Sequence, residues 1–123
     1  MTANIRLGSV SLDCADPHAL ADFWATLLGG EIAFRSDAFV AVQLNAMWLT
    51  TVAVENYVAP TWPAGDSPKQ MHLDLAVKDL AAAAQEALAL GATRADAQPN
   101  PDTYLVFFDP AGHPFCLTTQ IPD

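Results

Sequence analysis

One strand-to-helix pattern occurs twice in this chain, and it limits the possible folds more than any other feature. The second copy starts at residues 71–77, where apolar side chains alternate with His72, Asp74 and a small residue. That alternation is the period of a strand with one buried face. From Asp79 onward the apolar residues follow helical spacing as far as Gly91. Because Asp and Gly are typical first and last residues of helices, the pattern predicts a strand that leads directly into a helix.

The first copy lies near the start of the chain. Residues 7–13 alternate in the same way, Asp16 stands at the N-cap position, and a helical stripe of apolar residues runs to Gly29. When the two capping aspartates are aligned, Ser9 falls on His72. The sequence therefore predicts two copies of one structural unit.

Short runs rich in β-forming residues complete each unit after its helix. The expected strands cover residues 5–13, 31–35, 39–44, 47–54, 71–77, 93–95, 104–108 and 115–119, and the expected helices cover residues 17–28 and 80–90. Each half is thus a βαβββ unit, over residues 5–54 and 70–119, with a connector at residues 55–69. Such units predict an α+β fold, in which a curled mixed or antiparallel eight-stranded sheet forms a concave cup with the helices outside. A concave face is a favourable place for a small ligand.

Length and charge narrow the class of protein. At 123 residues the chain is expected to form a single domain, residues 1–123. Five Lys and Arg against fourteen Asp and Glu give a net charge of −9. An acidic surface repels phosphate backbones and anionic lipids, so binding to nucleic acid or to a membrane is not expected.

The remaining global features predict a cytoplasmic protein. No segment has the ~18 consecutive apolar residues of a transmembrane helix. A basic start followed by an apolar run, the mark of a signal peptide, is not visible. The two cysteines have neither metal-knuckle nor disulfide spacing, which is typical of a reduced compartment.

The connector carries Tyr57 and Trp62 among several prolines, without any periodicity. One interpretation is a lid over a ligand pocket. The other is packing on a neighbouring helix or subunit, because aromatic side chains dominate burial in cores and interfaces.

Several short motifs resemble those of the vicinal oxygen chelate superfamily, in particular its glyoxalase/bleomycin-resistance-like branch. The resemblance covers nearly the whole chain, and the motifs are Ser-Leu-Asp-Cys-Ala-Asp-Pro at residues 11–17, Phe23-Trp24, Leu28-Gly29, the segment from His72 to Asp79, Leu90-Gly91-Ala92, and the segment from Asp109 to Leu117. It implies a cup that binds a small organic molecule. It also implies a homodimer, since members of the superfamily commonly pair.

The resemblance also implies where a metal would lie. Members of this superfamily hold a divalent metal with His, Glu or Gln side chains from four positions on the cup. Here those positions are Ser9, Leu49 or Thr51, His72 and Cys116, and only His72 is a usual ligand. One His and one Cys on different strands would bind a divalent ion weakly, so no metal and no other cofactor is expected.

Polar residues at the inward-facing strand positions form the predicted ligand site. His72 is the candidate catalytic residue, as a general base or a polar anchor; the alternative is a half-buried structural histidine. Asp13 and Asp74 share the inward parity and would pair with His72, with hydroxyls of the cup such as those of Ser9 and Ser11, or with a cationic ligand. Their recruitment to a divalent metal is the alternative to a metal-free site. For Asp13, solvation near a turn is a further interpretation, and His18 and His113 are expected at the surface. The predicted set is Ser9, Ser11, Asp13, Thr51, His72, Asp74 and Cys116.

These features predict a small-molecule-binding, glyoxalase/bleomycin-resistance-like protein with a degenerate metal site. The alternative function is that of a metal-dependent lyase, isomerase or dioxygenase of the same superfamily. Drug sequestration, in which stoichiometric binding alone confers resistance, is a third hypothesis. Metal content distinguishes the first two.

Overall fold

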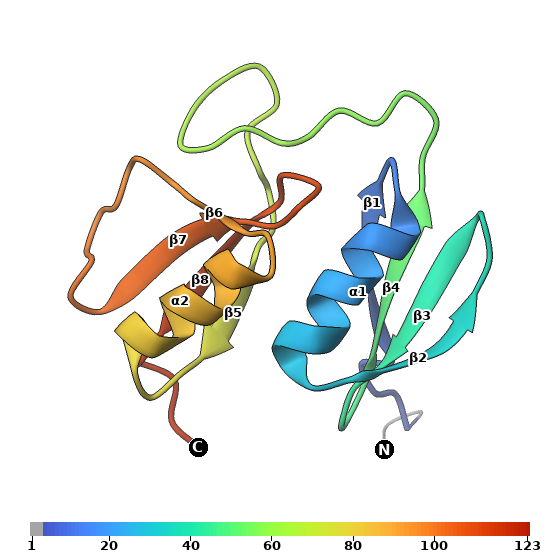
Figure 1. Ribbon diagram of the computed structural model, residues 1–123, viewed down its shortest axis with the longest axis horizontal. Coiled ribbons are helices and arrows are strands. Elements are labelled where there is room, and N and C mark those ends of the chain that lie inside the picture. Colours follow the sequence, from blue (N-terminus) through green and yellow to red (C-terminus); the bar gives the residue numbers. More distant parts are fainter. Residues whose placement is uncertain (1–3) are drawn as a thin grey trace. The chain divides into compact units, whose positions relative to one another are not determined.

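Two βαβββ units follow one another along the chain (Figure 1). The computed structural model describes residues 4–123, and the chain divides into two compact parts between Tyr57 and Val58. Unit 1 contains β1 (Ser9–Cys14), α1 (Pro17–Leu28), β2 (Glu31–Arg35), β3 (Phe39–Gln43) and β4 (Trp48–Ala53). Unit 2 contains β5 (Leu73–Ala76), α2 (Leu80–Ala89), β6 (Thr93–Arg94), β7 (Tyr104–Phe108) and β8 (Pro114–Thr118). The predicted α+β class and the repeated βαβββ order are confirmed.

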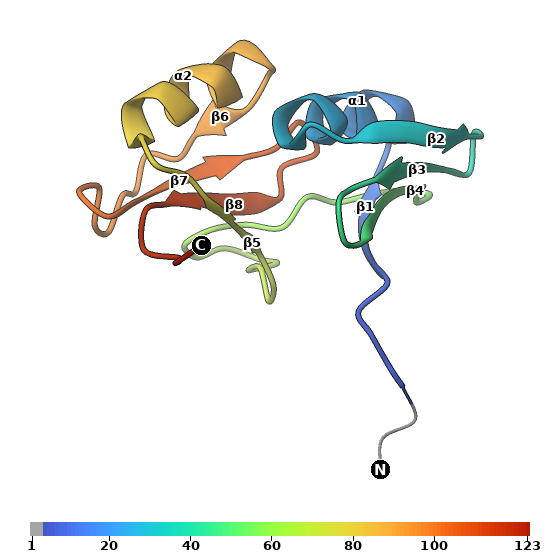
Figure 2. The same ribbon diagram turned by 90° about the horizontal axis from the view of Figure 1, so that it is seen from below.

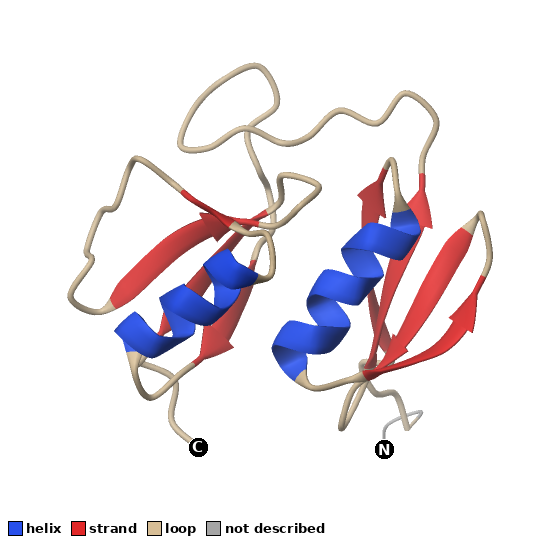
Figure 3. Ribbon diagram, in the orientation of Figure 1, coloured by secondary structure: helices blue, strands red, loops and turns tan. Residues whose placement is uncertain are grey.

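Each unit has its own four-stranded mixed sheet (Figure 3). The strand orders are β1-β4-β3-β2 and β5-β8-β7-β6. In both sheets the first pair is parallel and the other two pairs are antiparallel. Because the hydrogen-bonded ladders stay within each unit, the eight predicted strands form two four-stranded sheets in place of one continuous sheet.

The register of the two parallel pairs makes the units correspond residue by residue. In each unit the first strand lies parallel to the last strand, and the residue five places before the capping aspartate pairs with the last strand, Ser11 with Thr50 and Asp74 with Cys116. The predicted equivalence of the two strand-to-helix segments is therefore confirmed. Corresponding positions are Ser9 and His72, Ser11 and Asp74, and Thr50 and Cys116.

Local capping explains where the helices begin and end. The Asp16 carboxylate accepts hydrogen bonds from two backbone N–H groups of the first turn of α1, each at 3.1 Å. Gly29 ends this helix in the left-handed region, with φ of 68°, which glycine adopts without steric cost. In unit 2 the Asp79 carboxylate accepts from the N–H of Ala82 at 3.0 Å. The predicted bounds of α1 are those observed.

Each helix covers one face of its own sheet (Figure 2). In unit 1, Phe23 and Trp24 are buried, and their rings meet edge to face with centroids 5.1 Å apart. In unit 2, Ala87 of α2 is buried, as are Phe107 and Phe115, whose rings stack at 5.9 Å. The cores therefore lie between helix and sheet, and the other face of each sheet is left for polar residues. Neither of these helices, which are those of residues 4–123, is long and apolar enough to cross a membrane.

The connector lies against the other face of the unit 2 sheet, opposite α2 (Figure 2). It forms a closed loop, in which the N–H of Thr61 donates to the carbonyl of Ser67 at 2.7 Å and the N–H of Lys69 donates to the carbonyl of Thr61 at 3.0 Å. Trp62 and Lys69 of this loop line a cavity together with residues of β7 and β8. Both predicted first strands are longer than the observed ones: residues 5–8 precede β1, and β5 starts at Leu73.

Candidate functional site

Three chemically different side chains meet on the open face of the unit 2 sheet. Asp74 on β5 lies directly beside Cys116 on β8 because the two strands are parallel neighbours in this register. His72 comes two residues before Asp74, so its side chain lies on the same face. One nitrogen, one oxygen and one sulfur from these three residues all lie within 4.8 Å of one another.

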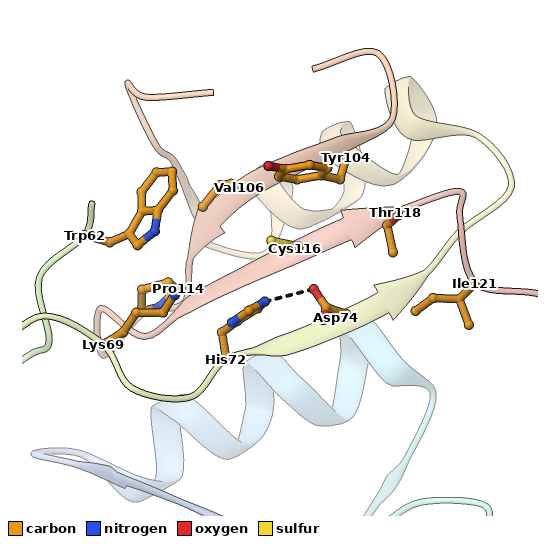
Figure 4. A pocket seen from close by; sticks show the side chains of 10 residues that line it. All are labelled: Trp62, Lys69, His72, Asp74, Tyr104, Val106, Pro114, Cys116, Thr118 and Ile121. Atoms are coloured by element: carbon orange, nitrogen blue, oxygen red, sulfur yellow. Dashed lines mark hydrogen bonds and ion pairs between the residues drawn. The ribbon is translucent and has the colours of Figure 1, made fainter. Parts of the chain in front are cut away.

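The imidazole of His72 and the carboxylate of Asp74 form a hydrogen bond. Nε2 of His72 lies 3.1 Å from Oδ1 of Asp74, within hydrogen-bond distance (Figure 4). An ionised carboxylate only accepts hydrogen bonds, so the imidazole N–H is the donor. Both side chains remain partly accessible, 34% for His72 and 49% for Asp74. The pair is therefore ordered but open to a ligand.

A cavity of about 380 Å³ adjoins the cluster. Its walls come from β5, β7, β8, the connector and the C-terminal segment (Figure 4). The volume suits a small organic molecule. The lining residues are Trp62, Lys69, His72, Asp74, Tyr104, Val106, Pro114, Cys116, Thr118 and Ile121.

The Cys116 thiol is held in its protonated form. Burial contributes most, the charge of Asp74 and a hydrogen bond to its carboxylate add to it, and together they raise the pKa of Cys116 from 9.0 to about 11. The positive charge of Lys69 acts in the opposite direction. At neutral pH this sulfur is therefore a hydrogen-bond donor to Asp74, and it has little nucleophilic character.

The residues predicted from the first half lie in unit 1. Ser9, Ser11 and Asp13 are all exposed and share one face of β1, as their alternation predicted. The hydroxyl of Ser9 lies 3.2 Å from that of Thr50 on the neighbouring strand. The structure thus brings His72, Asp74 and Cys116 together in unit 2, and the polar residues of β1 belong to unit 1.

Thr51 does not face a ligand, and this part of the prediction is wrong. Its side chain is fully buried under α1, where the hydroxyl donates a hydrogen bond to the Pro17 carbonyl at 2.7 Å. The register pairs Ser11 with Thr50, so Leu49 and Thr51 both point toward the helix. Thr50 holds the outward position.

Seven residues of the cavity wall lie outside the predicted set: the aliphatic Val106, Pro114 and Ile121, and four with polar or aromatic side chains. Trp62 and Lys69 come from the connector, Tyr104 from β7 and Thr118 from β8. Trp62 lines the cavity, in keeping with the interpretation of the connector as a lid. The alternation of β7 and β8 was the available signal for Tyr104 and Thr118, because each shares the parity of a residue on the open face.

The two other histidines lie outside the cavity. His18 is partly exposed on α1, 3.6 Å from the Asp37 carboxylate. His113 is less exposed than expected, because its Nδ1 lies 2.7 Å from Oδ2 of the buried Asp109. Asp109 also accepts from the backbone N–H of Ala111 and of His113, each at 2.9 Å. This carboxylate therefore organises the turn before β8.

The donor set of the cluster fits some metals better than others. Mg²⁺ and Mn²⁺ prefer several oxygen ligands, and the cluster supplies one carboxylate. Imidazole, carboxylate and thiolate are all ligands of Zn²⁺, and catalytic zinc sites use three protein ligands with one open position. His72, Asp74 and Cys116 would hold such an ion, which would supply Lewis-acid chemistry when bound.

Comparison with known proteins gives a consistent family and fold. Residues 9–118 match the sequence profile of a family described as a glyoxalase-like domain. The chain is similar in structure to a glyoxalase-related enzyme from Fulvimarina pelagi, with 25% identity, 92% of this chain and 86% of that chain covered, and a TM-score of 0.64. It is also similar to a glyoxalase/bleomycin resistance protein/dioxygenase family enzyme from Burkholderia phytofirmans PsJN, with 17% identity, coverage of 92% and 97%, and a TM-score of 0.69. A third similar structure is the fosfomycin resistance protein FosX from Mesorhizobium loti, with 13% identity, coverage of 98% and 94%, and a TM-score of 0.69. No protein of curated function matches the sequence.

Proposed function

Because the chain belongs to the glyoxalase-like domain family of the vicinal oxygen chelate superfamily, we propose that it binds a small organic molecule in the cavity of unit 2. The observation that carries the proposal is the His72–Asp74 pair, bonded at 3.1 Å on the wall of a cavity of about 380 Å³. An ordered polar pair beside apolar walls is the usual composition of a ligand pocket.

The chemistry of the wall indicates which groups of a ligand would be recognised. Asp74 accepts hydrogen bonds, so an amine or a hydroxyl of the ligand would bond to it. Trp62 and Tyr104 supply aromatic surface for a flat apolar part. Lys69 supplies a positive charge near the same cavity. The proposed ligand therefore has a hydrogen-bond donor on one side and an apolar or weakly acidic part on the other.

A second candidate is favoured by the third member of the cluster. The sulfur of Cys116 lies within 4.8 Å of ligand atoms of His72 and Asp74, so the three would serve a metal-dependent lyase, isomerase or dioxygenase. In that function His72 would be a ligand of the metal and would not serve as a general base. In the first function His72 is a polar anchor, or a base that takes a proton directly from the bound molecule.

The proposal is tested by ligand screening on protein treated with a chelator. Thermal-shift screening would include bleomycin, fosfomycin and a panel of small amines and aromatic acids, followed by NMR titration of each hit. We expect His72→Gln to weaken binding of a hit at least tenfold, about 1.4 kcal/mol. His18→Gln is the matched control and should leave the affinity unchanged. Equal affinity in all three proteins would place the binding site elsewhere and overturn the proposal.

Drug sequestration is the form of this function in which the protein binds the compound without catalysing any reaction. Tight one-to-one binding of bleomycin or fosfomycin, with the compound recovered unchanged, would support it. Recovery of a modified compound would instead support the enzymatic candidate.

A further inference from the structure

We propose that the indole N–H of Trp62, the ammonium group of Lys69 and the hydroxyl of Tyr104 form a subsite for an oxyanion, such as a carboxylate, on a small aromatic ligand. The inference rests on the proposed function and deepens it, because it names the charged group of the ligand and the residues that would hold it. None of the three residues belongs to the ligand set predicted from the sequence.

Three hydrogen-bond donors line this cavity without an acceptor from the protein. Trp62 and Lys69 come from the connector and Tyr104 from β7, and all three residues are partly buried. Within residues 4–123, none of the three side chains has a hydrogen-bond or ion-pair partner. Indole and ammonium groups only donate hydrogen bonds, so the natural complement of this set is an acceptor-rich group.

The donors lie at one end of the cavity. In Figure 4, Trp62 and Lys69 stand on the same side, and the hydroxyl of Tyr104 is directed toward them. Asp74 lies farther along β5, beyond His72, and its carboxylate is already bonded to that imidazole. An anionic group would be repelled by Asp74 and attracted by Lys69, so the charges favour one orientation of the ligand.

The charge of Lys69 distinguishes an anion from a neutral ligand. Acidic residues outnumber basic ones fourteen to five in this chain, yet no carboxylate of residues 4–123 pairs with Lys69. Its charge acts inside the cavity, because it lowers the pKa of Cys116 against the larger opposing effects. A bound carboxylate would gain a charge-assisted hydrogen bond from Lys69, which is about twice as strong as a neutral one.

The rest of the wall suits a flat apolar ring. Val106 and Pro114 supply aliphatic surface beside the aromatic rings of Trp62 and Tyr104. A cavity of about 380 Å³ is large enough for one substituted aromatic ring. The combination of ring surface with a cationic end is the chemistry that recognises an aromatic acid.

Benzoate and benzyl alcohol are the probes, because they share a ring and differ in charge. The chain has three tryptophans, so the indole N–H signals can be followed by NMR and the Trp62 signal assigned with Trp62→Phe. We expect benzoate to shift the Trp62 signal until it saturates, and to bind at least about tenfold more tightly than benzyl alcohol. The signal of Trp24, which is buried in the core of unit 1, should not move. Phenylphosphonate distinguishes a tetrahedral oxyanion from a planar one, and preference for either anion supports the inference.

Two lysine variants make a matched pair. Lys69→Met should weaken benzoate binding at least about tenfold and leave benzyl alcohol binding unchanged, because it removes only the charge. Lys78→Met removes the same charge at an exposed residue outside this cavity, and it should leave both affinities unchanged. Tyr104→Phe keeps the ring, and it should weaken benzoate binding by a smaller factor. Circular dichroism checks each fold, and Lys69→Gln replaces Lys69→Met if the latter does not fold.

The outcomes separate this inference from the proposed function. Equal affinity for the anions and for benzyl alcohol, an unmoved Trp62 signal, or equal losses from Lys69→Met and Lys78→Met would each overturn the oxyanion subsite. A neutral or amine ligand that still binds, and that His72→Gln weakens, would keep the cavity as the ligand site without this subsite. Loss of the proposed function itself would show in its own screen, through equal affinity in the wild type and His72→Gln.

Discussion

Asp74 connects the two other members of the cluster. Its carboxylate accepts the hydrogen bond of the His72 imidazole and also that of the Cys116 thiol. Burial is the main reason that the thiol stays protonated, and the negative charge that orders the imidazole adds to that effect. A single substitution at residue 74 should therefore change the behaviour of both neighbours.

Alkylation of Cys116 tests this coupling. Since the pKa of the thiol is raised from 9.0 to about 11, its thiolate fraction at pH 8 is about a hundredfold smaller than that of an ordinary thiol. We expect iodoacetamide to label Cys116 slowly at pH 8, and the rate to rise as the pH approaches 11. Asp74→Asn should speed the labelling at pH 8, because it removes the charge that opposes ionisation. Mass spectrometry identifies the labelled cysteine, and the urea-unfolded chain gives the reference rate. Fast labelling of the folded wild type at pH 8 would contradict the raised pKa.

Two adjacent threonines on β4, Thr50 and Thr51, should contribute unequally to stability. Thr51 is fully buried and donates a hydrogen bond to the Pro17 carbonyl at 2.7 Å, whereas Thr50 lies on the open face. Thr51→Val keeps the side-chain shape but leaves the carbonyl without that donor, so we expect a loss of about 1 to 2 kcal/mol in the free energy of unfolding. Thr50→Val, the control, should change it by less than about 0.5 kcal/mol. Urea denaturation measures both, and equal losses would refute the assignment of the two faces.

Among the helices and strands, the features that could be predicted were those set by residues close in the sequence, such as helix caps. Helix α1 was predicted to the residue because Asp16 and Gly29 act within one turn of its ends. The parity of β4 was not predictable, since residues 47–54 are almost all apolar or Thr and do not alternate. Only its pairing with β1 shows that Thr50 faces outward. Trp62 and Lys69 reach the cavity from a loop without periodicity, so their position depends on tertiary contacts.

The helix caps should contribute measurably to stability. The Asp16 carboxylate accepts two backbone hydrogen bonds at the start of α1, and we expect Asp16→Ala to lower the free energy of unfolding by about 1 kcal/mol. Asp13→Ala is the control, because Asp13 is exposed on β1 and caps no helix; its effect should be within about 0.5 kcal/mol. Urea denaturation followed by circular dichroism compares the two variants. A loss from Asp13→Ala as large as that from Asp16→Ala would argue against a specific capping effect.

At the scale of the whole molecule, we propose that residues 1–123 function as one domain and that the protein forms a homodimer. Unit 1 leaves large apolar side chains on its surface: Phe34 is 49% exposed and Phe39 40% exposed, and their rings lie 5.1 Å apart. An exposed aromatic pair is a common feature of protein interfaces. Light scattering after size-exclusion chromatography should give a mass of twice the chain's 13.1 kDa. A mass of one chain at micromolar concentration would contradict the dimer.

The correspondence between the two units has a consequence for engineering. Ser9, Ser11 and Thr50 occupy the places in unit 1 that His72, Asp74 and Cys116 occupy in unit 2, and the first and last of the unit 1 set already touch at 3.2 Å. Unit 1 thus has the same backbone arrangement, with hydroxyl side chains at the positions where unit 2 carries ionisable groups. The triple variant Ser9→His, Ser11→Asp, Thr50→Cys should build the same cluster in unit 1, so that one chain would carry two copies of the His–Asp–Cys arrangement.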